Sequence, residues 1–170
     1  MRVFGRKSAV GCVLAVFVMM SVVGAGRAAE TVEMMDRADE YGEMGLSLLK
    51  QGNINEGTKF LQAATKTNPY DAKWHLHYAR ILREKGLAEM KAGNRIIGRR
   101  IFKLVEKEYL MATKIFMGYR DNANAASTLF QVAEINKSVY QRPRIAAGYY
   151  LKVLQLDPNH GGAKKALGRS

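Results

Sequence analysis

From residue 31 onward, apolar residues recur at intervals of three and four positions rather than at every second position. That spacing places them on one face of an α-helix. Turn-forming pairs interrupt the pattern at Gly52-Asn53, Asn68-Pro69, Gly93-Asn94, Asp121-Asn122 and Asp157-Pro158. The pattern predicts an all-α chain with helices over residues 31–51, 54–67, 71–91, 95–119, 123–140, 143–155 and 160–168. Asp71 and Asn159 are the expected N-caps of the third and the last helix.

The chain also contains an internal repeat. A first unit has the spacing Tyr41-x2-Met44-Gly45-x2-Leu48-x8-Gly57-x3-Leu61-x2-Ala64-x4-Pro69. Its first half recurs 34 residues later as His75-x2-Tyr78-Ala79-x2-Leu82, and its second half recurs as Ala146-x3-Tyr150-x2-Val153-x4-Pro158. Small residues let two antiparallel helices approach closely, while large residues fill the layer between them. The spacing therefore predicts helical hairpins.

This spacing resembles the tetratricopeptide repeat (TPR) over most of residues 31–168. The resemblance implies antiparallel helical hairpins stacked as a short solenoid, with a C-terminal capping helix. We expect a first repeat over residues 38–71, a second repeat with a degenerate central region over 72–141, and a last half-repeat with the cap over 142–170.

The first 28 residues have the order of an export signal. Arg2, Arg6 and Lys7 precede an uncharged run over residues 8–26, and small residues follow up to the expected cleavage site after Ala28. An uncleaved anchor is the alternative, because a run of 19 residues approaches the roughly 20 that span a bilayer. We therefore expect an exported protein of a bacterial envelope, in the periplasm or anchored in the inner membrane.

The charge balance narrows the classes of partner. The chain holds 27 Lys and Arg against 15 Asp and Glu, a net charge of +12. Removal of residues 1–28, which hold four bases and no acid, leaves +8. Because export separates the chain from chromosomal DNA and ribosomes, we expect no nucleic acid partner. Acidic proteins and anionic envelope surfaces fit the charge better.

Residues that could carry catalysis do not form a recognisable set. His75 and His77 are two positions apart, so that they point to different sides of a helix and cannot share a metal. Cys12, the only cysteine, lies in the signal segment. We expect no enzyme activity, no metal and no cofactor, and we expect methionines to fill the core. The methionines beyond residue 28 are Met34, Met35, Met44, Met90, Met111 and Met117.

The TPR resemblance also indicates a groove lined by the first helix of each hairpin. The residues that it places there are Asp39, Gly42, Leu46 and Leu49 from the first unit, and Lys73, Leu76, His77, Arg80 and Arg83 from the second. Gly42 and Leu46 occupy places where chaperone-binding members carry a lysine and an asparagine, so that their carboxylate clamp is absent. We hypothesise that Lys73, Arg80 and Arg83 attract an acidic protein segment, while the leucines supply apolar contact.

A second basic feature follows the long central helix. Arg95, Arg99, Lys103 and Lys107 recur at four-residue spacing, opposite an expected core stripe of Ile97, Ile101, Leu104 and Ile115. This face is either solvated or docks on anionic lipid or polymer. The function predicted from the sequence is a non-catalytic adaptor, scaffold or assembly factor of the envelope. The alternatives are a peripheral envelope-binding protein and a membrane-tethered subunit, and exposed leucines leave self-association open.

Overall fold

The computed structural model describes residues 10–169, with side chains from residue 29 onward. The described chain folds into seven helices and contains no strand. They are α1 (Val10–Lys50), α2 (Ile54–Thr67), α3 (Ala72–Lys91), α4 (Arg95–Gly118), α5 (Asn122–Ser138), α6 (Pro143–Leu156) and α7 (Gly161–Ala166). The expected helices agree with these bounds to within two residues, apart from the start of α1.

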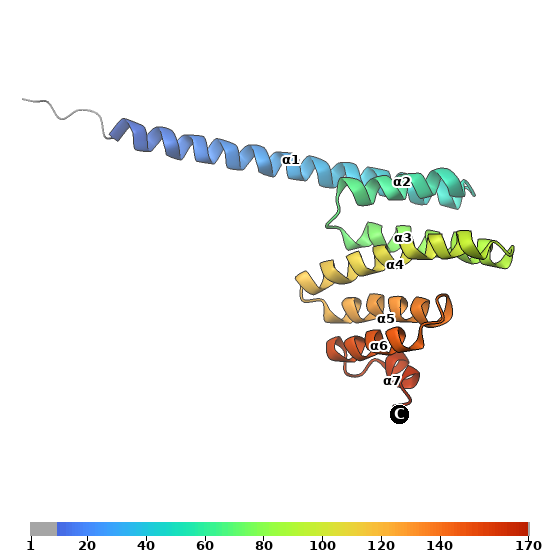
Figure 1. Ribbon diagram of the computed structural model, residues 1–170. Helices are drawn as coiled ribbons and strands as arrows, with labels where there is room; N and C mark the ends of the chain where they lie inside the picture. Colours follow the sequence, from blue (N-terminus) through green and yellow to red (C-terminus); the bar gives the residue numbers. More distant parts are fainter. Residues whose placement is uncertain (1–9, 170) are drawn as a thin grey trace, which may run out of the picture.

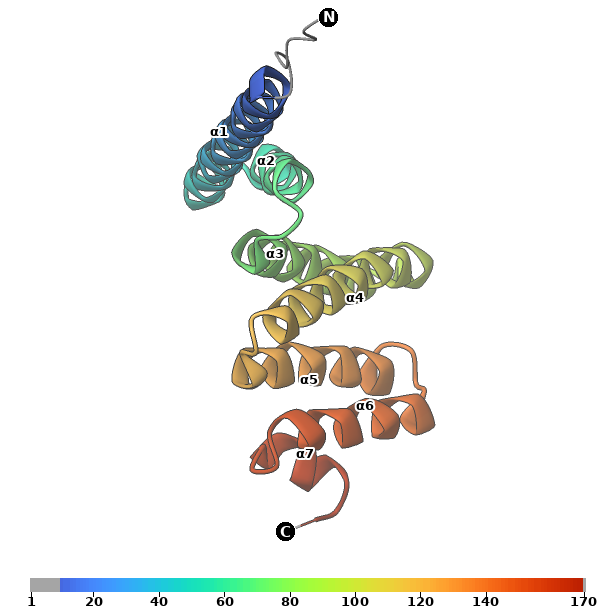
Figure 2. The same ribbon diagram turned by 90° about the vertical axis from the view of Figure 1, so that its left-hand side faces the viewer.

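The helices form three antiparallel hairpins that stack in one direction. The extensive contacts all join helices that follow one another in the sequence. Figures 1 and 2 show the hairpins α1–α2, α3–α4 and α5–α6 one below another, with the short α7 packed against α6. The expected all-α solenoid with a C-terminal cap is therefore confirmed.

The alternation of small and large residues explains the close approach within the first hairpin. A β-carbon at Gly45 would lie 3.0 Å from Cγ of Leu61 and 3.1 Å from the carbonyl oxygen of Gly57. Leu61 and Ala64 are completely buried. The same rule holds late in the chain, where Ala146, Tyr150 and Val153 are all buried, as the repeat spacing requires.

Backbone groups at the helix ends are satisfied locally. Gly52 and Gly93 end α1 and α3 at φ angles of +82° and +87°, a conformation that glycine adopts without a steric penalty. Asp71 caps α3 by accepting a hydrogen bond of 2.8 Å from the amide of Lys73, as expected. The expectation for Asn159 was wrong. His160 is the N-cap of α7, because its Nδ1 atom accepts from the amide of Ala163.

The expectation of which side of α4 faces the core was wrong. Ile97 and Leu104 are 48% and 45% exposed. The buried apolar side chains of α4 are instead Phe102, Val105, Tyr109 and Ala112, while Ile101 and Ile115 are half-buried. The reason is a glycine contact that fixes the helix about its axis. A β-carbon at Gly98 would lie 2.4 Å from Cγ of Met90 and 3.0 Å from the carbonyl oxygen of Gly86.

Methionine proved to be a poor marker of the core. Met34, Met35, Met44 and Met117 are all 44–52% exposed, so that the expectation of core filling was wrong for them. Met90 and Met111 are half-buried.

The expected signal segment at residues 1–28 lies outside the residues whose side chains the structure describes. In the part of the chain that is described, no helix is both long enough and apolar enough to cross a membrane.

Candidate peptide-binding groove

Three adjoining cavities follow α3 on one side of the stack. Their volumes are about 930, 530 and 290 Å³. Arg80 lines all three, and Leu76 and His77 each line two. Because the cavities share these side chains, they form one continuous depression. We call it the α3 groove.

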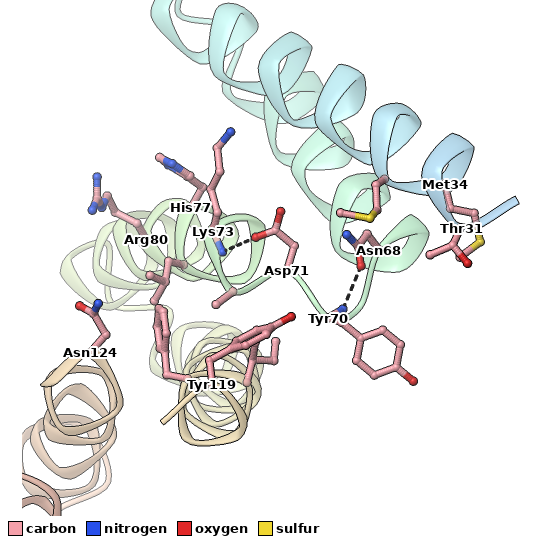
Figure 3. A pocket seen from close by; sticks show the side chains of 15 residues that line it. Thr31, Met34, Asn68, Tyr70, Asp71, Lys73, His77, Arg80, Tyr119 and Asn124 are labelled. Carbon is pink, nitrogen blue, oxygen red and sulfur yellow. Dashed lines mark hydrogen bonds between the residues drawn. The ribbon is translucent and has the colours of Figure 1, made fainter. Parts of the chain in front are cut away.

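The largest cavity lies between α1, the start of α3, the end of α4 and the start of α5. Figure 3 shows Met34 of α1 and Tyr119, the residue that follows α4, on opposite sides of it. Phe116 and Leu76 add apolar surface to its lining. This end of the α3 groove therefore offers an apolar and aromatic surface.

Arg80 and Arg83 are the two cations of the smallest cavity, whose lining contains no acid. Both side chains are exposed, and neither forms an ion pair with any described residue. Lys73 differs, because its ammonium nitrogen lies 3.2 Å from Glu43 and 3.9 Å from Asp39. Lys50 also has no ion pair among the described residues, but the cavity that it lines contains the acid Glu84. The attraction for an anion is therefore strongest at the two arginines.

His77 lies between these charges and adds none at neutral pH. Burial, followed by the positive charges of Arg80 and Lys73, lowers the pKa of His77 below its usual value of 6.5. The neutral imidazole can donate one hydrogen bond and accept another. The groove thus places a neutral polar ring beside the fixed charge of Arg80.

The structure brings most of the predicted groove residues together. Leu46 and Leu49 line one cavity with His77 and Arg80. Lys73 and Leu76 line the largest cavity, and Arg83 lines the smallest.

The two other residues of the first unit have different contacts. The Asp39 carboxylate accepts a hydrogen bond of 2.9 Å from Nε1 of Trp74. Gly42 is buried beneath the same indole ring. These two residues position Trp74 and line none of the three cavities.

Sequence reasoning missed the aromatic wall of the groove. Phe116 lies on α4, the second helix of a hairpin, and Tyr119 directly follows that helix, whereas the TPR resemblance places only first helices in the groove. They reach it because α4 is 24 residues long, compared with 14 for α2 and α6. Nothing in the repeat spacing shows where this extra length leads.

The basic residues of α4 form a separate surface. Arg95, Arg99, Lys103 and Lys107 are all exposed, and none lines the α3 groove. The structure therefore keeps the two predicted basic regions apart.

The histidines of α3 face different surroundings. His75 is 4% exposed, and its Nδ1 atom lies 2.5 Å from Oε2 of Glu108, whereas His77 faces the groove. Among the described residues, no three or more His, Cys, Asp or Glu side chains are grouped in a way that could hold a metal ion.

Comparisons with known proteins bear on the fold. No family model matches the chain, and no curated protein matches it in sequence. The N-terminal domain of stress-induced protein-1 (STI-1) from C. elegans superimposes with a TM-score of 0.62 and 14% identity, over 79% of this chain and 95% of that one. The Arabidopsis OM64 TPR domain superimposes with a TM-score of 0.54 and 19% identity, over 79% and 94%. The chain thus has a fold similar to that of TPR domains.

Proposed function

We propose that the chain is a non-catalytic protein-binding module whose α3 groove holds an acidic, extended segment of a partner. The observation that carries this proposal is the position of Arg80. Its guanidinium group has no ion-pair partner among the described residues, and its side chain lines all three cavities. A carboxylate entering from any of them can pair with it, and such charge-assisted hydrogen bonds are about twice as strong as neutral ones.

The lining of the groove also indicates which side chain of the ligand lies next to its acidic group. Phe116, Tyr119 and Leu76 line the largest cavity, next to Arg80. Apolar anchors in a pocket supply most of the energy in peptide recognition, while charged pairs contribute more to specificity and rate of association. The ligand therefore carries a large apolar side chain near its acidic residue.

The fold agrees with this use. A stack of helical hairpins presents an extended surface instead of a closed active-site cavity. The similarity to TPR domains is a likeness of fold, so that the identity of the ligand rests on the groove residues of this chain alone.

Selection from a random peptide library against the full chain tests the proposal. We expect the selected peptides to be enriched in Asp or Glu beside a Leu, Ile, Phe or Met. The double variant Arg80→Glu, Arg83→Glu should bind them at least about tenfold more weakly, since two attractive pairs become repulsive. The double variant Arg99→Glu, Lys103→Glu is the control. It has the same net charge as the first double variant and should bind the peptides as tightly as the unaltered chain does. Peptides without acidic enrichment, or equal loss in both variants, would refute the proposal.

We further propose that residues 1–28 direct export to the bacterial envelope, where the chain acts as an adaptor or assembly factor. The order of a basic start, an uncharged run and small residues supports this. Edman sequencing of the chain recovered from the periplasm should give Ala29 as the first residue. Recovery of the intact N-terminus with the membranes would favour a tethered subunit instead.

A further inference from the structure

The outward side of α4 combines exposed apolar residues with basic residues. Ile96, Ile97 and Leu104 are 72%, 48% and 45% exposed. Five exposed bases lie on the same stretch of helix. These are Arg95, Arg99, Arg100, Lys103 and Lys107. We call the eight residues together the α4 outer face.

The positive charge of the α4 outer face is not neutralised by neighbours. None of its five bases forms an ion pair within the described part of the chain. The two acids of the same stretch are engaged elsewhere. Glu108 is buried against His75, and Glu106 accepts a hydrogen bond of 2.7 Å from the side-chain amide of Asn136 on α5. The face therefore attracts anions.

The two isoleucines lie at the projecting end of the second hairpin. In Figure 1, the turn between α3 and α4 extends further to the right than the turns of the other two hairpins. Since α4 begins at Arg95, Ile96 and Ile97 are the first apolar residues after this turn. They are part of no cavity described above, and their exposure is not explained by packing within the chain.

We propose that the α4 outer face docks on a membrane that contains anionic phospholipid. The isoleucines enter the boundary between headgroups and acyl chains, and the bases contact lipid phosphates. Amphipathic helices bind at this depth through apolar residues that enter the boundary and through Lys and Arg residues that are attracted to anionic lipids. Each base near an anionic membrane surface contributes about 1 kcal/mol, or roughly a fivefold gain in affinity.

A lipid surface fits these residues better than an acidic polymer or protein. A polymer would neutralise the bases but leave the projecting isoleucines in water. A folded protein would need a matching hollow for a projecting tip, whereas a bilayer yields to it. The proposal is independent of peptide binding in the α3 groove, because the two surfaces share no residue.

Sedimentation of the full chain with vesicles tests the charge component. We expect binding to phosphatidylcholine vesicles that contain phosphatidylglycerol, and less binding to phosphatidylcholine alone or at high salt. Arg99→Glu, Lys103→Glu should weaken binding by about thirtyfold or more, since two contributions are lost. The control variant Arg80→Glu, Arg83→Glu has the same net charge as Arg99→Glu, Lys103→Glu and should bind the vesicles as the unaltered chain does. All variants keep residues 1–28, so that a contribution from that segment cancels in the comparison.

Fluorescence tests the insertion of the isoleucines. Ile96→Trp should show a blue shift with the anionic vesicles, because its indole leaves water, while the native Trp74 is already buried. Tyr119→Trp, at the mouth of the α3 groove, is the control and should not shift. Equal binding of both charge variants, or no blue shift at residue 96, would overturn the proposal. So would binding of α4 to an acidic protein without any binding to vesicles.

Discussion

The indole ring of Trp74 lies directly against the backbone of Gly42, at the junction of the first two hairpins. A β-carbon at residue 42 would lie 2.2 Å from Cη2 of the ring, closer than any real contact. The Asp39 carboxylate, one turn earlier on α1, accepts the indole N–H at 2.9 Å. The only tryptophan of the chain therefore joins α3 to α1. Its ring fits there because Gly42 has no side chain.

Replacement of Gly42 by alanine should destabilise the chain. Overpacking of a core costs about 1–3 kcal/mol, which exceeds the gain of roughly 1 kcal/mol that alanine brings to a helix. We expect a lower melting temperature by circular dichroism. Gly148→Ala is the matched control, because a β-carbon there meets nothing within 4 Å, and it should raise the melting temperature. If both variants shifted in the same direction, the packing of Trp74 on Gly42 would not be the cause.

The buried contact between His75 and Glu108 holds a proton. Nε2 of His75 lies 3.1 Å from the carbonyl oxygen of Pro69, which can only accept, so that Nε2 carries a hydrogen. At the other side of the ring, Nδ1 faces a Glu108 oxygen at 2.5 Å. Two acceptors would repel each other at that distance. One proton must therefore lie between them, on the imidazole or on the carboxyl group.

The loss of stability on replacement of Glu108 should depend on whether the new side chain can donate a hydrogen bond to His75. Glu108→Leu leaves a buried imidazole without its partner and should cost about 3 kcal/mol of the free energy of unfolding. Glu108→Gln should cost clearly less, since its amide N–H can donate to a neutral Nδ1. Urea unfolding of both variants measures the difference. Equal losses for Leu and Gln would show that the hydrogen bond does not stabilise the α3–α4 contact.

Two tyrosines of the last hairpin differ in their hydroxyl partners. The Tyr140 hydroxyl is buried and has no hydrogen-bond partner among the described residues, whereas the Tyr150 hydroxyl donates to Glu134. Tyr140→Phe should therefore leave stability unchanged or raise it by about 1 kcal/mol. Tyr150→Phe should lower it by a similar amount. Thermal melts of the pair check this, and a larger loss for Tyr140→Phe would contradict it.

Tyr140 should also make stability fall at alkaline pH. Burial, with a smaller effect of Glu106, raises the pKa of Tyr140 from 10.0 to about 12. Because the folded state then holds the phenol proton more tightly than the unfolded state, this stabilisation is complete below pH 10. It is lost as the pH rises towards 12. The free energy of unfolding of the unaltered chain should decline more steeply than that of Tyr140→Phe between these values. Parallel curves would exclude Tyr140 as a source of the decline.

The sequence predicted the stacked hairpins because their signals are local. Leu61 and Ala64 follow a helical period, and Asp71 satisfies the amides of its own helix. The rotation of α4 was not predictable in this way. Both Ile97 and Phe102 fit an apolar stripe, and the choice between them is made by the contact of Gly98 with α3, which depends on another helix.

The groove could be predicted only in part for a similar reason. Arg80 and Leu76 were identified because the repeat fixes which side of α3 faces the groove. The partners of Lys73, on α1, reduce its charge and are 30 or more residues away in the sequence. Phe116 and Tyr119 reach the groove through the length of α4. Such relationships become visible only when the helices are placed in space.

A charge-swap experiment on Arg80 tests the central claim most directly. A selected acidic peptide is titrated against the full chain and against Arg80→Glu by calorimetry, and then the peptide with its acidic residue changed to lysine is titrated against both. We expect the first change to weaken binding by about tenfold or more and the combined changes to restore most of it, because opposite charges again meet in the groove. The lysine peptide should bind Arg80→Glu better than it binds the unaltered chain. If it does not, the assignment of the α3 groove as the binding site is contradicted.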